Sequence, residues 1–208
     1  MTDHRDALVE RGGAELDLFG GPYIRRDAVF AGEDRLELRR WWETEGPWAC
    51  VIGCNPSTAN ALEDDPTSRW WNRWFRAFGF RGYSAVNLYP FCTSSPAECG
   101  KRADWQNNGP DWYARDALHH NLDHVVKTAK AADQVFVCFG AIAWDAEWID
   151  HVVEAVQSDV EPWPDLWCWG ETNSGAPKHP LARGKHRIPV DQPALLWSPS
   201  IAPRGPAA

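Results

Sequence analysis

The sequence predicts an α/β protein built as a three-layer α/β/α sandwich around a mostly parallel central sheet of four or more strands. Two observations lead to this fold class. Short apolar runs with the character of buried strands alternate along the chain with longer segments of helical periodicity. The run Trp48–Cys54 is also continuously apolar, which is the signature of a central parallel strand that is buried on both faces.

The first third of the chain predicts three strands. Residues 1–22 are polar and aperiodic, and we expect a flexible lead-in before a single α/β domain over residues 23–208. Short strands are predicted over Tyr23–Phe30 and Arg35–Trp42, on either side of a turn. Trp48–Cys54 is a continuous apolar run, which predicts a central strand buried on both faces.

The rest of the chain alternates between helix and strand. Thr67–Gly79 is predicted to be a helix, because its aromatic residues recur at helical spacing and Gly79 ends the pattern. The elements expected after it are a strand at Tyr83–Tyr89, a loop to Pro110, a helix at Asp111–Ala131, a strand at Gln134–Phe139, a helix at Ala143–Gln157 and a strand at Asp165–Trp169. We expect residues 50–54, 84–88, 135–139 and 165–169 to be adjacent core strands.

Composition narrows the possible partners. The net charge of −8 disfavours a protein that wraps duplex DNA, because such binding needs a contiguous basic surface. The segment after Ala176 nevertheless holds five Lys or Arg residues against one acid, which favours a phosphate-bearing ligand. Most of the 14 tryptophans are expected in the core.

No run of 18 apolar residues and no hydrophobic signal core are present, so we expect neither membrane insertion nor secretion. The six cysteines lack zinc-site spacing, and we expect reduced thiols with no metal and no cofactor.

The clearest candidate site follows the first central strand, in the segment Gly53–Arg69. In parallel sheets, ligands bind beyond the carboxyl ends of the strands. Pro56 fixes the backbone there, Ser57 and Thr58 suit an anion-accepting turn, and Thr67 is expected to cap the next helix. The candidates at this strand end are Gly53, Asn55, Pro56, Ser57, Thr58, Asp64, Asp65, Thr67 and Arg69.

Other strand ends add further polar groups. Asn87 closes one strand, Gly140 follows another, and His179 lies in a late loop rich in Gly and Pro. We expect Asn55, Asn87 and His179 to line one pocket. The basic residues expected to hold a phosphate are Lys178, Arg183, Lys185 and Arg187.

Four motifs in order resemble the family known as domain of unknown function 1643. They are W-A-C-V-I-G-C-N-P-S-T-A with D-D-P-T-S-R, then V-N-L-Y-P-F, then F-V-C-F-G-A-I-A-W, then G-x-P-x-H-P-L. The resemblance covers roughly residues 35–189. It implies a cytoplasmic protein of bacteria or their phages and supplies no reaction.

Two of these segments also resemble loops of DNA glycosylases. Gly53–Pro56 is similar to the G-I-N-P motif of mismatch-specific uracil/thymine-DNA glycosylases, and Lys178–Leu181 to the H-P-S-x-L loop of the wider uracil-DNA glycosylase superfamily. This resemblance implies the α/β/α fold of those enzymes. It also implies that Asn55 and the Pro56 carbonyl position water, that Asn87 reads the base and that His179 stabilises the departing base.

The chemistry of N-glycosidic cleavage fits these residue types. The reaction builds positive charge on the sugar, which Asp64 or Asp65 would stabilise, and negative charge on the base. We therefore expect a glycosylase-like hydrolase acting on a nucleotide or a nucleic acid, single-stranded or with a flipped base. The alternatives are a non-catalytic nucleotide- or nucleic-acid-binding module and a transferase or hydrolase that modifies phage DNA bases.

Overall fold

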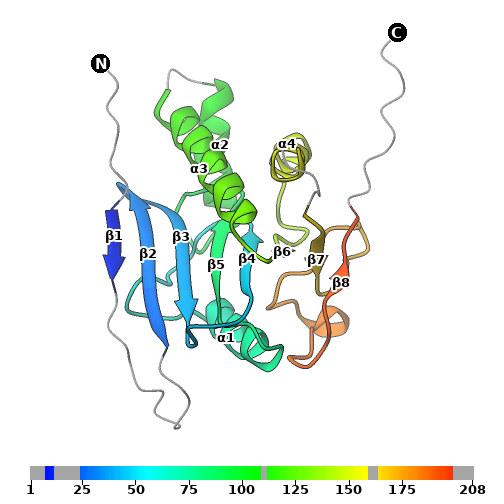
Figure 1. Cartoon of the computed structure of the whole chain (residues 1–208). Coiled ribbons are helices and arrows are strands. Elements are labelled where there is room, and N and C mark those ends of the chain that lie inside the picture. Colours follow the sequence, from blue (N-terminus) through cyan, green and yellow to red (C-terminus); the bar gives the residue numbers. More distant parts are fainter. Residues whose placement is uncertain (1–7, 12–23, 109–111, 159–163, 199–208) are drawn as a thin grey trace.

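One sheet forms the centre of the protein (Figure 1). The structure, a computed structural model, describes residues 8–11, 24–108, 112–158 and 164–198. The strands are β1 (Leu8–Arg11), β2 (Arg25–Ala31), β3 (Asp34–Trp41), β4 (Trp48–Gly53), β5 (Gly82–Asn87), β6 (Gln134–Val137), β7 (Leu166–Cys168) and β8 (Leu195–Leu196). Their order is β1-β2-β3-β5-β4-β6-β7-β8, so the four predicted core strands are indeed neighbours.

The sheet is mixed, and the prediction of a mostly parallel sheet was wrong. β4 pairs in parallel with β5 and β6, and β6 pairs in parallel with β7. The pairings β1–β2, β2–β3, β3–β5 and β7–β8 are antiparallel. Hydrophobic patterning identifies a strand, but it does not show whether the neighbouring strand runs parallel or antiparallel to it. Here the three N-terminal strands form an antiparallel flank beside the parallel centre of the sheet.

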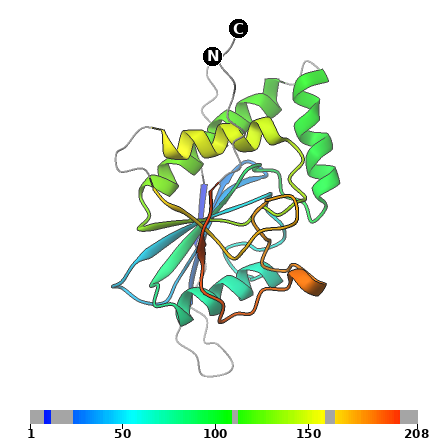
Figure 2. The same cartoon turned by 90° about the vertical axis from the view of Figure 1, so that its right-hand side faces the viewer.

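Helices lie on both faces of the sheet (Figure 2). They are α1 (Pro66–Ala77), α2 (Pro96–Asn108), α3 (Trp112–Lys130) and α4 (Ala146–Gln157). The aromatic stripe of α1, including Trp74 and Phe75, packs against one face of β4, β5 and β6. Side chains of α2, α3 and α4 cover the opposite face. The two apolar layers hold the carboxyl ends of the parallel strands in fixed positions. None of the described helices is long and apolar enough to span a bilayer.

Two segments expected to be irregular are regular. α2 replaces the first part of the loop expected before Pro110, and Ser95 accepts a hydrogen bond from the amide of Glu98 through Oγ at 3.3 Å. Ser-Pro-Ala-Glu is a capping-box sequence with proline at the first helical position, a signal that predicts this helix. In the expected lead-in, Leu8–Arg11 form β1, because they pair with β2. The rest of the lead-in lies outside the described residues.

Candidate functional site

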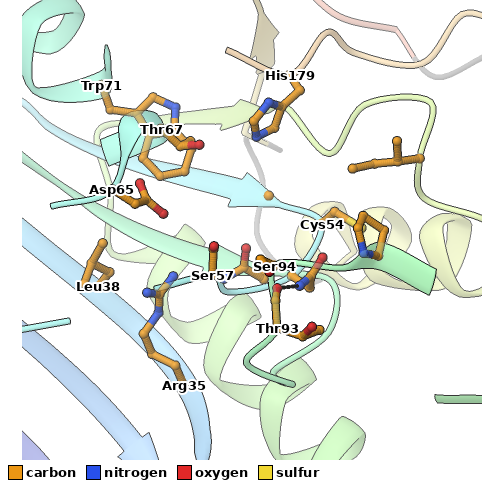
Figure 3. A pocket seen from close by; sticks show the side chains of 15 residues that line it. Arg35, Leu38, Cys54, Ser57, Asp65, Thr67, Trp71, Thr93, Ser94 and His179 are labelled. Carbon is orange, nitrogen blue, oxygen red and sulfur yellow. Dashed lines mark hydrogen bonds between the residues drawn. The ribbon is translucent and has the colours of Figure 1, made fainter. Parts of the chain in front are cut away.

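A cavity of about 220 Å³ opens at the carboxyl ends of β4 and β5 (Figure 3). It receives seven of the residues that the sequence suggested: Gly53, Asn55, Ser57, Asp65, Thr67, Asn87 and His179. They come from the loop after β4, the start of α1, the end of β5 and the loop after β7. The structure therefore brings Asn55, Asn87 and His179 together, across 124 positions of sequence.

The remaining candidates do not line this cavity. Thr58, Arg69, Arg183, Lys185 and Arg187 are exposed, the last three in and around the short 3-10 helix Gly184–His186. Arg183, Lys185 and Arg187, which were expected to hold a phosphate, are therefore not placed to contact a ligand inside the cavity. A residue that follows a strand in sequence can be assigned to that end of the sheet, but the sequence does not show where its side chain points.

Lys178 and Gly140 support the loop that carries His179. The amide of Lys178 donates to the carbonyl of Gly170 at 2.8 Å. Gly140 has a positive φ of 72°, and its amide donates to the Pro177 carbonyl at 2.9 Å. A Cβ at Gly140 would lie 3.4 Å from the Cβ of His179, which is ordinary contact, so glycine is favoured here by the positive φ and not by lack of space.

Asp64 is held in a buried ion network outside the cavity. Its carboxylate accepts from Nε of Arg40 at 2.7 Å, from Nη2 of Arg26 at 3.3 Å and from Nδ2 of Asn72 at 2.9 Å. The two guanidinium groups lower the pKa of Asp64 against the opposing effect of burial. Arg40, fully buried, also donates to the carbonyls of Asn60 and Glu63. These contacts fix the loop to β3, and Asp64, an expected catalytic carboxylate, does not line the cavity.

Asp65 lines the cavity and caps α1. Its Oδ1 accepts from the amide of Ser68 at 2.7 Å, so Asp65 and not Thr67 is the N-cap. Pro66 follows as the first helical residue, where its missing N–H costs nothing. The cap fixes the direction of the carboxylate, and Figure 3 shows Asp65 across the cavity from His179.

Asn55 has a fixed orientation. Its Nδ2 donates to the Pro56 carbonyl at 3.0 Å and to the Thr93 carbonyl at 2.7 Å. Both N–H groups are thereby used, and Oδ1 is the acceptor that remains. The Pro56 carbonyl also accepts from the amide of Thr93 at 3.0 Å. With both lone pairs of the Pro56 carbonyl occupied, the water that this carbonyl was expected to position finds no free acceptor on it in this arrangement.

His179 presents a neutral ring to the cavity. Its Nδ1 accepts a hydrogen bond from the amide of Leu181 at 3.2 Å, so the ring proton lies on Nε2. Burial lowers the pKa of His179 to about 4, against the opposing effect of Asp65. At neutral pH this residue is therefore an N–H donor and not a cation.

Asn87 lies at the end of β5, directly opposite Gly53 in the β4–β5 pairing. Its Oδ1 would be 2.7 Å from a Cβ at Gly53, so only glycine leaves room for this amide. Its backbone carbonyl accepts from Nδ2 of Asn121 at 2.9 Å. Nδ2 of Asn87 is buried and has no hydrogen-bond partner among the described residues.

Arg35 is the principal site residue that sequence reasoning missed. It lies on β3, is 4 % exposed, and lines the cavity. Strand alternation with Leu36 and Leu38 suggests a solvent-facing position, but the loop after β4 lies against Arg35, whose Nη1 donates to the Ala59 carbonyl. The other lining residues not predicted are Leu38, Cys54, Trp71, Thr93, Ser94, Pro96 and Ile142. The capping box at Ser95 was the available signal for Thr93, Ser94 and Pro96.

The cysteines are free thiols. Burial raises the pKa of Cys54, the one that lines the cavity, to about 12, so this thiol is a poor nucleophile at neutral pH. Within the described residues no group of three His, Cys, Asp or Glu side chains is arranged to hold a metal ion.

The chain belongs to the family described as "Protein of unknown function (DUF1643)", which matches residues 35–181. The match begins at Arg35 and ends just after His179, so it includes every residue that lines the cavity. No curated protein and no solved structure gave a significant match.

Proposed function

We propose that the protein is an enzyme that recognises a nucleobase and hydrolyses the N-glycosidic bond of a nucleotide or of a base in nucleic acid. The observation that carries this proposal is the convergence of Asp65, His179 and Asn87 on one cavity. Cleavage of this bond needs a negative group near the sugar and a donor near the departing base. The cavity offers one of each on opposite sides.

The roles follow from the protonation and contacts of each group. The Asp65 carboxylate would stabilise the positive charge that develops on the sugar. The neutral His179 ring would donate from Nε2 to the departing base anion, and Asn87 would pair with the edge of the base. Oδ1 of Asn55 would accept from the attacking water, because both donors of this amide are committed.

The similarity of Gly53–Pro56 and Lys178–Leu181 to glycosylase loops supports the same proposal. Both segments lie at carboxyl ends of parallel strands, where a ligand of an α/β sheet binds. We extend the proposal to the fold, and suggest that β5, β4, β6 and β7 with their helices correspond to the α/β/α core of the uracil-DNA glycosylase superfamily.

The Asp65→Asn variant tests the proposed reaction. Asparagine also caps helices, so the fold is expected to persist while the carboxylate charge is lost. We expect a fall in rate of about 100- to 1000-fold with little change in ligand affinity, because the charge acts mainly in the transition state. The assay measures release of free base from uracil-, thymine-mismatch- and hypoxanthine-containing oligonucleotides and from free nucleotides.

Glu63→Gln is the matched control, since Glu63 is an exposed carboxylate in the same loop and does not line the cavity. Its rate should equal that of the wild type. Tight nucleotide binding by a wild-type protein that releases no base from any substrate would refute the enzyme and favour a binding module. Equal rates for Asp65→Asn and the wild type would remove Asp65 from the mechanism.

A further inference from the structure

The guanidinium of Arg35 is buried at the cavity, where the Asp65 carboxylate acts on it electrostatically but forms no ion pair with it. Its Nη1 donates to the carbonyl of Ala59, and its Nε is buried with no hydrogen-bond partner among the described residues. No ion pair of Arg35 is found in that part of the chain either. Figure 3 shows the guanidinium directed into the cavity, toward Ser57 and Asp65.

Arg40, on the same strand, shows what a structural arginine requires in this protein. Arg40 is fully buried, but an Asp64 oxygen lies 2.7 Å from its Nε and four backbone carbonyls accept from its two terminal nitrogens. Arg35 has one such carbonyl. A buried cation with unfilled donors is costly, and arginine remains charged in proteins, so an anion from outside the chain is the natural partner.

The surroundings of Arg35 suit a phosphate group. The hydroxyl residues Ser57, Thr67 and Ser94 line the same cavity. The planar fork of arginine matches two phosphate oxygens, and hydroxyl groups can donate to the others.

We infer that Arg35 binds the phosphate of a free nucleoside monophosphate, so that the substrate is a mononucleotide and not a nucleic-acid strand. The phosphate subsite is independent of the reaction, whereas the identity of the nucleoside part rests on the proposed function. A sugar cation beside Asp65 and a phosphate beside Arg35 would use both charges of the cavity. The exposed cations Arg183, Lys185 and Arg187, which a strand would need, do not line it.

Calorimetric titration of the full chain tests the subsite directly. The probes are inorganic phosphate, the nucleoside 5′-monophosphates, the corresponding nucleosides and a single-stranded oligonucleotide. We expect the monophosphates to bind at least about 10-fold tighter than the nucleosides, and inorganic phosphate to compete with them, because a charge-assisted hydrogen bond is worth about a factor of 10 to 100. Nucleosides that bind as tightly as their monophosphates, or tightest binding by the oligonucleotide, would overturn the inference.

Arg35→Met assigns the effect to this residue. Methionine fills the volume without a charge, so the free protein should unfold at the same or a higher temperature, while affinity for the monophosphates falls at least about 10-fold. Arg35→Lys should recover part of the lost affinity for the monophosphates. The exposed control Arg183→Ala should bind them with wild-type affinity. If Arg35→Met fails to fold, the double variant Ser57→Ala/Thr67→Val serves as the test. It should fold, bind the nucleosides as the wild type does and bind the monophosphates more weakly. Wild-type affinity in the folded Arg35→Met variant, or in the double variant if that is needed, refutes the subsite.

The two proposals fail in different ways. Arg35-dependent binding of monophosphates without release of base would keep the subsite and refute glycosidic cleavage. Release of base from oligonucleotides, with no binding of monophosphates, would keep the reaction and refute the subsite.

Discussion

Asp64 and Asp65 are adjacent in sequence but lie in different surroundings, because their partners differ. The Asp64 carboxylate is enclosed by Arg26, Arg40 and Asn72, and each oxygen is committed to a donor. Asp65 uses Oδ1 to cap α1 and faces the cavity. The sequence offered two equivalent carboxylates. Strands β2 and β3 supply both arginines and so distinguish Asp64, which is bound within the protein, from Asp65, which lines the cavity.

Replacement of Asp64 by alanine should therefore reduce stability. The change leaves the fully buried Arg40 with no counter-ion, and loss of one partner of a buried ion pair costs about 3–5 kcal/mol. We expect a fall of about 3 kcal/mol or more in the free energy of unfolding, measured by urea denaturation at pH 7. The exposed neighbour Glu63→Ala should change it by less than about 0.5 kcal/mol. An Asp64→Ala protein of normal stability but no activity would return Asp64 to the catalytic site.

At the scale of the element, the ends of β4 and β5 shape the cavity through a single close approach. Gly53 and Asn87 are register partners, and an added Cβ at Gly53 would contact the end of the Asn87 side chain rather than backbone. In Gly53→Ala the amide of Asn87 must therefore turn away, which costs little stability but removes it from the ligand.

We expect Gly53→Ala to weaken ligand binding about as much as Asn87→Ala does, roughly 10-fold for one lost pair of hydrogen bonds. The double variant should bind no more weakly than either single variant, because both changes remove the same amide. Calorimetric titration with the best monophosphate measures all three. Additive losses in the double variant would show that Gly53 acts on the ligand independently of Asn87.

The elements also show how far the sequence alone could predict this protein. β4, β5, β6 and β7 are identified by continuous apolar runs, and the rule for strand ends then gives Asn55, Asn87 and His179. Two features could not follow from patterning. The direction of β3 beside β5 depends on tertiary pairing, and the burial of Arg35 depends on the loop that Arg40 holds over it. By contrast, α2 could have been predicted from its capping box.

At the scale of the whole molecule, the site combines two halves of one sheet. The parallel centre supplies Asp65, Asn87 and His179 through its strand ends, and the antiparallel flank supplies Arg35 from β3. Arg183, Lys185 and Arg187, which follow β7 in the chain, are exposed and do not line the cavity. A ligand in the cavity therefore meets one buried cation, whereas a strand on the surface would meet several exposed ones in the field of a chain with a net charge of −8.

The dependence of binding on salt distinguishes these two modes. A single strand held by Lys178, Arg183, Lys185 and Arg187 would give a slope of about −3 in a plot of log affinity against log salt concentration, from about −0.7 for each phosphate neutralised. A monophosphate at Arg35 should show a much shallower slope, because buried charges are screened far less than exposed ones. Titrations of both ligands between about 50 and 500 mM salt measure the slopes, with Arg183→Ala/Lys185→Ala/Arg187→Ala as the matched variant. We expect this triple variant to leave the monophosphate slope and affinity unchanged, since none of the three side chains lines the cavity. The opposite result would be a steep slope for the monophosphate with the wild type and a shallow slope with the triple variant. That result would place the anion on the exposed basic segment and leave the charge of Arg35 without a ligand.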